Sequence, residues 1–269
     1  MRQIDLTDIP IARVETTSSK GNQSKWNIDS KWYKMDCEGY EAFSEFISAE
    51  ILKKSNISRY ARYSLCKIVL HDVPYNGCVS DDFLQDGEEL FTLERLVKQK
   101  FGFSLMGRLH EFDSVEQRVD FTLERLQELG VERAGEYLTA LTEIDALLFN
   151  GDRHTNNIAF VRKNDGSIIP APFFDQGNGL FSDLVWHPLH IENDALPTRA
   201  AAKPFSGDFD RQKEYLESLF GVQLRFSYTE KDLEKSLSQA EMYYSSKIIQ
   251  RVRFLMKYQT KKYKELQMD

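Results

Sequence analysis

The chain has 269 residues, of which 41% are hydrophobic and 29% are charged. These proportions are ordinary for a folded globular protein and exclude a chain that is disordered over most of its length. Acidic residues outnumber basic ones by 42 to 35, and the net charge of −7 argues against a protein built chiefly to bind nucleic acid phosphates.

The cysteines and the apolar runs further limit the class of protein to which the chain can belong. Cys37, Cys66 and Cys78 are too widely spaced to suggest a disulfide framework or a cysteine zinc site. No apolar run is long enough to span a bilayer, and the first residues lack the apolar stretch of a signal peptide. We therefore expect a cytoplasmic protein without a membrane span, although secretion by a signal-independent route is compatible with the sequence.

The N-terminal part has the pattern of short strands around a polar loop. Apolar and aromatic residues predict strands at 9–14, 26–28 and 32–35. The loop at 15–25 contains a single glycine, so the spaced glycines of a phosphate-binding loop are absent. A solvated hairpin loop is one interpretation, and anion binding through backbone N–H groups is the other. The candidates for anion binding are Ser18, Ser19, Lys20 and Gly21.

A lysine and a glutamate in this part are candidates for an ion pair. Lys34 lies between aromatic and apolar neighbours, as expected of a strand lysine that reaches into a cleft, and Lys31 is the competing candidate. Apolar residues at helical spacing predict a helix over 40–54. Glu45 lies beside the apolar stripe of this helix and is the candidate partner of Lys34, with Glu41 as the alternative.

The pattern predicts a predominantly helical chain from residue 88 onward. Ser114 and Gln117 have the spacing of a capping box at a helix start, and Gly130 marks the end of that helix. A wide apolar stripe over 132–149 predicts a buried helix, which gives rigid support to the segment after it. Two β-rich segments precede these helices, at 63–73 and 77–84.

The segment after the buried helix carries the main functional pattern. Asp152 and Asn157 are separated by four residues, and a further acid, Asp175, follows 18 residues after Asn157. Phosphoryl transfer requires a carboxylate that orients the acceptor hydroxyl and oxygen ligands for Mg²⁺. Asp152 suits the first role, and Asn157 and Asp175 suit the second. An ordinary turn also uses Asp, Asn and Gly, so this spacing alone is a weak signal.

A predicted hairpin strengthens this interpretation. Apolar residues predict strands at 158–161 and 172–174, and Asp165-Gly166 between them is typical of a hairpin turn. Such a hairpin would bring all three polar side chains to one edge of a small sheet.

At these residues the chain resembles a known family. Gly151-Asp152-Arg153-His154 followed by Asn157 and a strand-borne Asp175 is similar to the HipA-like serine/threonine kinases. Phosphatidylinositol 3- and 4-kinases share the lead-in, and aminoglycoside phosphotransferases share it more loosely. The resemblance is strong over about residues 140–180. Asp175 is followed by Gln176-Gly177 instead of Phe-Gly, so a switch based on movement of a Phe is not implied.

The resemblance implies an α+β, two-lobed protein-kinase-like fold. The small β-rich N-lobe would cover 1–84, and the mainly helical C-lobe would cover 85–269. ATP and Mg²⁺ are the implied cofactors, with Lys34 and Glu45 orienting the phosphates. The resemblance also implies a hinge segment between the lobes, whose backbone groups would hydrogen-bond to adenine. A simple strand and turn is the alternative interpretation of the same segment. The hinge candidates are Cys78, Val79 and Phe83.

The resemblance also implies a protein substrate, phosphorylated on Ser or Thr, and an antitoxin or another regulatory protein as partner. Members of the family can autophosphorylate in the phosphate-binding loop, so we expect modification at Thr17, Ser18 or Ser19. An inositol lipid or a small molecule is an alternative acceptor, because the motif can position any hydroxyl. A nucleotide-binding interaction module with weak catalysis is an alternative of another class.

A zinc hydrolase is a further alternative, less favoured by the spacing. His187 and His190 flank a proline, and His154 and Asp183 could complete a zinc site. The proline between the two histidines does not suit a helical His-x-x-x-His pair. His154 is better explained by a hydrogen bond within its own loop, and Arg153 by positioning that loop or binding phosphate.

Overall fold

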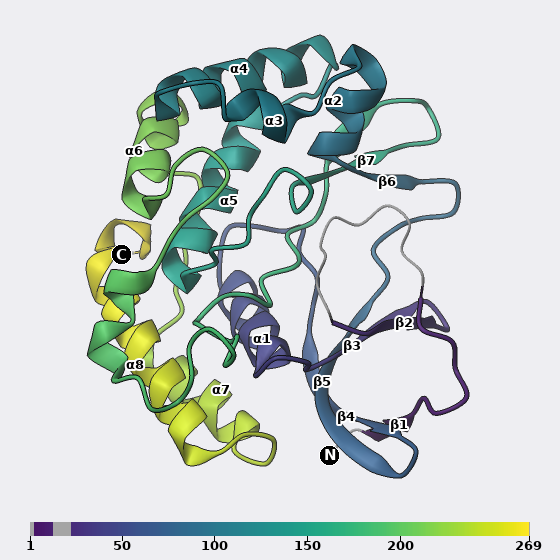
Figure 1. Cartoon of the computed structure of the whole chain (residues 1–269), viewed down its shortest axis with the longest axis vertical. Helices are drawn as coiled ribbons and strands as arrows, with labels where there is room; N and C mark the ends of the chain where they lie inside the picture. The colour runs from purple at the N-terminus through teal and green to yellow at the C-terminus, as the bar shows by residue number, and fades with distance from the viewer. Residues whose placement is uncertain (1–2, 13–22, 269) are drawn as a thin grey trace.

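A computed structural model describes residues 3–12 and 23–268 of the chain. Its secondary structure is mixed α+β, with a curled five-stranded sheet on one side and most of the helices on the other (Figure 1). Helix α1 (Glu41–Leu52) lies between the sheet and the helical part, where it packs on both. The helix expected at 40–54 is thereby confirmed.

The five-stranded sheet has the order β1-β4-β5-β3-β2, and only β1 and β4 are parallel. Its strands are β1 (Gln3–Asp5), β2 (Lys25–Ile28), β3 (Lys31–Met35), β4 (Ser64–Leu70) and β5 (Val73–Asp81). The strands expected at 26–28 and 32–35 are confirmed. The strand expected at 9–14 is wrong over 9–12, because Pro10 has no N–H for a ladder, and the rest of it lies outside the described residues.

The two faces of this sheet have different environments. Lys34 is paired in register with Cys78, and both side chains point toward α1. Tyr33 is paired with Val79, and these two point to the opposite face, into a small apolar core that includes Trp26. Strand alternation therefore decides which residues can reach a site between the sheet and the helices.

The helical part is organised around α5 (Ala134–Leu148), in which every residue except Glu136 is buried. The surrounding helices are α2 (Leu93–Phe101), α3 (Leu105–Leu109), α4 (Val115–Glu128), α6 (Phe209–Phe220), α7 (Glu230–Ala240) and α8 (Ser246–Lys262). Three short 3-10 helices lie at Asn193–Ala195, Pro197–Arg199 and Lys264–Leu266. The capping box at Ser114 and Gln117 is present at the start of α4.

A second, three-stranded sheet lies beside α2. It consists of β6 (Glu89–Thr92), β7 (Ala159–Arg162) and β8 (Ile168–Pro170), in that order. The expectation of helix directly from residue 88 is wrong, because β6 precedes α2. The second hairpin strand lies at 168–170 instead of 172–174, because the turn after Arg162 is short and pairs that residue with Ile168. Phe173 forms only an isolated bridge with Tyr60.

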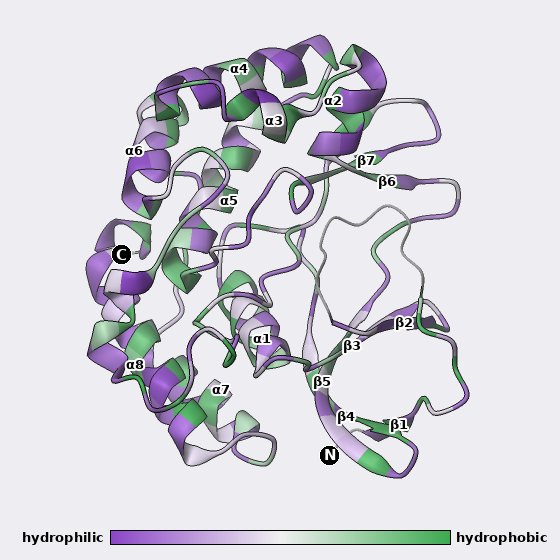
Figure 2. Cartoon of the chain, in the orientation of Figure 1, coloured by the Kyte–Doolittle hydropathy of each residue, from purple (hydrophilic) through white to green (hydrophobic). Residues whose placement is uncertain are grey.

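Hydrophilic and hydrophobic residues are interspersed along α4 and α8, as expected for helices with one buried side (Figure 2). No helix in the ranges 3–12 and 23–268 combines the length and apolar composition needed to cross a bilayer.

Candidate active site

The loop that carries Asp152 starts where α5 ends. Phe149 closes the helix with φ 53°, in the left-handed region, and the Asn150 N–H donates to the Asp145 carbonyl at 2.8 Å. The Asn157 side-chain amide then donates to the backbone oxygen of Asp152 at 2.7 Å and to its carboxylate at 3.3 Å. The five-residue interval therefore closes into a tight loop in which a carboxylate and a carboxamide lie side by side.

Arg153 holds this loop from the protein interior. Its side chain is 1% exposed and donates two hydrogen bonds to the Asp145 carboxylate, at 2.7 and 3.0 Å. It also donates to the carbonyl oxygens of Asn157 at 2.6 Å and Asp175 at 3.3 Å. One rigid, planar cation thus fixes the relative position of both proposed metal-binding residues. Of the two roles considered for Arg153, the geometry favours positioning the loop.

Lys34 and Glu45 form a buried ion pair between β3 and α1. Lys34 also lies 3.0 Å from the Asp175 carboxylate, so three distant segments of the chain meet at its ammonium group. The second oxygen of Glu45 accepts the backbone N–H of Gln176 at 2.9 Å, which ties α1 to the residue after Asp175. The competing candidates have other partners, although Glu41 lines the smaller cavity described below. Lys31 pairs with Asp81 at the surface, and Glu41 accepts N–H groups of the loop before α1.

The opposite charges in this cluster stabilise each other's ionised forms. Burial by itself would raise the pKa of Asp175, but the neighbouring Lys25 and Lys34 keep it well below its usual range. Burial would lower the pKa of Lys34, but Asp175 and Glu45 raise it well above its usual value. Asp175 is therefore ionised and Lys34 protonated across the physiological pH range.

Lys25 is a site residue that the sequence did not single out. It lies at the start of β2, opposite Lys34 across the β2–β3 ladder, and its ammonium group is 3.6 Å from the Asp175 carboxylate. In the sequence it is the last residue of a polar loop, where a lysine carries no distinguishing signal. Only the strand register shows that Lys25 and Lys34 point toward the same acid.

Two cavities meet at Asp175 and Lys25. The larger has a volume of about 430 Å³ and is lined by aromatic and aliphatic side chains together with Lys25, Lys34 and Asp175. Its apolar lining residues include Trp32, Ala61, Phe83, Leu84, Leu90 and Phe174. The smaller cavity is lined by Asp152, Asn157 and Asp175, together with Lys25. The three polar residues therefore face one space, which joins a larger and more apolar one.

The hinge candidates are distributed unequally around the larger cavity. Phe83 lines it, together with Ser80 and Asp82. Cys78 is buried against α1 and Val79 faces the opposite side of the sheet, and neither belongs to the cavity wall. Strand alternation turns Val79 away from the cavity and α1 covers Cys78, so on this strand the cavity wall starts at Ser80.

The donor set at the smaller cavity suits a hard cation. The side-chain oxygen of Asn157 is buried and has no hydrogen-bond partner among the described residues. It lines the same space as the ionised Asp175 carboxylate. Mg²⁺ is typically held by one or two such protein oxygens, with water and phosphate oxygens completing its octahedron. A buried oxygen without a donor is costly unless a cation or water satisfies it, so the residues fit this ion.

The zinc alternative has little support in the geometry. Among the described residues, no group of three or more His, Cys, Asp or Glu side chains is arranged to hold a metal ion. The His187 ring packs edge-on against Phe181, at 4.8 Å between ring centroids. The His154 imidazole lies 3.8 Å from the Asp152 carboxylate, and burial lowers its pKa. The candidates Ser18, Ser19, Lys20 and Gly21 lie outside the described residues.

Comparison with known proteins gives a match at the level of structure. No protein-family model matches the chain, and a search of curated proteins finds no significant match. The crystal structure of a Helicobacter pylori proinflammatory kinase, CtkA, is similar with a TM-score of 0.63 and 17% sequence identity. The similarity covers 98% of this chain and 96% of that chain. The chain therefore has a kinase-like α+β fold.

Proposed function

We propose that the chain is an ATP- and Mg²⁺-dependent kinase that transfers the γ-phosphoryl group to a Ser or Thr hydroxyl of a protein, as HipA-like kinases do. The observation that carries the proposal is the meeting of Asp152, Asn157 and Asp175 at one cavity that opens onto a larger one lined by Lys25 and Lys34. The two-lobed organisation, with a boundary between residues 84 and 85, is part of this proposal.

The larger cavity has the chemistry that a nucleotide requires. Its aromatic lining residues, Trp32 and Phe174, suit a flat base, and its lysines suit phosphates. Lys34 is held in position by Glu45, so little side-chain entropy is lost when it binds an anion. Lys25 adds a second positive charge on the same side of Asp175.

Asp152 is the residue that would act on the acceptor hydroxyl. This carboxylate would orient the acceptor hydroxyl and take its proton while the acceptor oxygen bonds to the γ-phosphorus and the bond to the bridging oxygen breaks. Bound Mg²⁺ would neutralise charge on the phosphate oxygens, and Asn157 and Asp175 are the residues that would hold it. Arg153 keeps these residues in register through the backbone.

The test has a binding arm and a transfer arm. Isothermal titration of the protein with ATP should show binding that requires Mg²⁺ and is weakened by Asn157→Ala. Labelled γ-phosphate should reach a generic protein substrate, and Asp152→Ala should abolish the transfer while ATP binding persists. Absence of Mg²⁺-dependent ATP binding in the unaltered protein would refute the proposal.

Autophosphorylation is the second part of the proposal. After incubation with ATP and Mg²⁺, we expect intact-mass spectrometry to show added phosphate, and fragmentation to locate it at Thr17, Ser18 or Ser19. Asp152→Ala should remove the modification. A mass gain that survives this substitution would contradict self-modification by this site.

A further inference from the structure

A third cavity lies beside the catalytic loop, next to His154 and Thr155. Its volume is about 320 Å³, and neither Lys25 nor Asp175 reaches it. Its wall is formed by α3 and the residue after it, by His154 and Thr155 of the catalytic loop, and by the segment 202–207. The nucleotide-type cavity shares none of these lining residues. The two spaces are therefore separate subsites.

Two residues connect this cavity directly to the candidate catalytic carboxylate. Lys203, at the cavity wall, has its ammonium group 3.3 Å from one oxygen of Asp152. The His154 imidazole, also at the wall, lies 3.8 Å from the other oxygen. A group bound in the cavity would therefore be adjacent to a hydroxyl held by Asp152.

The segment 201–207 is fixed firmly against the catalytic loop. A side chain at Gly151 would come within 2.6 Å of the Ala201 carbonyl oxygen, so the two backbones are in close contact. The buried Gln212 of α6 donates to the Lys203 carbonyl at 3.1 Å and accepts the Phe205 N–H at 3.3 Å. The cavity wall is thus built from well-anchored backbone, as a binding subsite requires.

The chemistry of the wall favours an apolar occupant. Met106, Leu109, Ala202 and Pro204 are its apolar lining residues. The guanidinium group of Arg118 also borders the cavity, but it is committed to backbone carbonyls, among them Phe112 at 2.7 Å and Phe205 at 3.0 Å.

Little cationic capacity is left for a multiply charged ligand. The Thr155 hydroxyl donates to Glu94 at 2.8 Å. Lys203 is the other Lys or Arg side chain among the described lining residues, and it already pairs with Asp152. A multiply charged inositol phosphate headgroup would require several free cations.

From this geometry we infer that the cavity is an acceptor subsite that binds an apolar side chain of a protein substrate, a few residues from the phosphorylated Ser or Thr. This inference rests on the proposed kinase function and names its substrate class. The occupant is a Leu, Ile, Met or Phe side chain presented by an extended or irregular segment of another protein.

The experiment uses the full chain with Mg²⁺, labelled ATP and peptides that contain one Ser, with each neighbouring position varied in turn. We expect an apolar residue to be selected at one fixed position. Met106 is 44% exposed, so Met106→Glu alters the wall without a large change in the core. It should lower kcat/KM for the selected peptide roughly tenfold or more and shift the selection toward Lys or Arg.

Matched variants separate the subsite from general effects. Met106→Lys should shift the selection toward Asp or Glu, and this opposite shift keeps the inference testable even if one variant is poorly folded. Met242, 59% exposed in the turn between α7 and α8, is the control, and Met242→Glu should leave peptide selection unchanged.

Three results would overturn the inference. These are peptide phosphorylation without selection at any position, selection that Met106→Glu and Met106→Lys leave unchanged, and labelling of phosphatidylinositol vesicles in place of peptides. A failure of the proposed function would be recognised separately, as absence of Mg²⁺-dependent ATP binding in the unaltered protein, and it would remove the acceptor assignment with it.

Discussion

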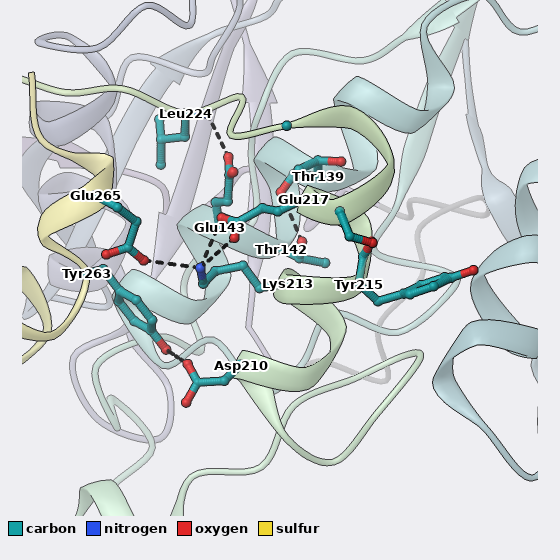
Figure 3. A network of polar contacts seen from close by, with 12 residues as sticks. Thr139, Thr142, Glu143, Asp210, Lys213, Tyr215, Glu217, Leu224, Tyr263 and Glu265 are labelled. Atoms are coloured by element: carbon teal, nitrogen blue, oxygen red, sulfur yellow. Dashed lines mark hydrogen bonds and ion pairs between the residues drawn. The ribbon is translucent and has the colours of Figure 1, made fainter.

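Two buried clusters of charge in this molecule are built from the same residue types but have different surroundings. Around Lys34, the carboxylates of Glu45 and Asp175 come from α1 and from the segment after β8. Around Lys213, the carboxylates of Glu217 and Glu265 come from α6 and the C-terminal 3-10 helix (Figure 3). Each lysine ammonium is thus shared between two acids.

The surroundings decide what each cluster can do. Asp175 borders two cavities, and one of them is also lined by Asn157, whose side-chain oxygen has no hydrogen-bond partner in the part of the chain that the structure describes. In the second cluster, Glu143 accepts the backbone N–H groups of Gln223 and Leu224, at 3.0 and 2.6 Å, and its neighbours Lys213 and Glu217 are engaged with each other (Figure 3). None of these residues lines either cavity beside Asp175. A buried lysine is therefore a functional signal only where its acid partner also faces open space.

The largest effect should come from Asp152→Asn, at the smaller cavity that Asp175 of the first cluster also lines. Because the amide cannot accept the acceptor proton, we expect kcat to fall roughly 10²–10⁴-fold. ATP affinity should be retained, since Asp152 does not line the larger cavity. Steady-state kinetics combined with ATP titration measures both quantities. An unchanged kcat would remove Asp152 from the site.

Replacement of each central lysine compares the clusters directly. Lys34→Met leaves Glu45 buried without its cation, and we expect the free energy of unfolding to fall by about 3–5 kcal/mol. Lys213→Met should cost less, because Glu265 is partly exposed and can be hydrated. Denaturant unfolding measures the stabilities. Only Lys34→Met should also weaken Mg²⁺-ATP binding, and an equal loss of binding in Lys213→Met would contradict the distinction.

Arg153→Lys tests how the first cluster is positioned. Lysine keeps the charge but cannot donate at once to Asp145 and to the carbonyls of Asn157 and Asp175. We expect a loss of about 2 kcal/mol in stability and a fall in kcat that exceeds any change in the KM for ATP. A variant with lowered stability but unaltered kcat would show that the positioning is not needed.

The smallest effect is a pH dependence located in the second cluster. Burial, aided by the nearby Glu217, raises the pKa of Glu143 to about 8, so the folded protein binds a proton that the unfolded chain releases near pH 4.5. The free energy of unfolding should therefore decline as the pH rises from about 4.5 to about 8, with a slope from this group of at most about 1.4 kcal/mol per pH unit.

Glu143→Gln is the matched variant for this effect. It keeps an acceptor for the two N–H groups and should flatten the pH dependence of stability without changing activity. Because burial also raises the pKa of Asp36 to about 7, the measurement is the difference between the two proteins across pH. Parallel stability curves would show that Glu143 does not titrate in this range.

The sequence by itself determined the local features of this protein. Asp152 and Asn157 are only five positions apart, so once this interval forms a tight loop their side chains lie close together. The apolar stripe over 132–149 determined a buried helix, and the capping box determined the start of α4, because both depend on spacing along one helix. Lys34 and Glu45 could be identified as candidates from the apolar residues around each of them in the sequence.

Only the tertiary structure decided what depends on contacts between distant segments. Strand register directs Lys25 toward Asp175 and turns Val79 away from the cavity, and a shift of one residue would have reversed both. The segment 201–207 reaches Asp152 across 51 residues of chain, through Lys203. Such contacts arise from packing of whole elements, and no spacing within a single segment encodes them.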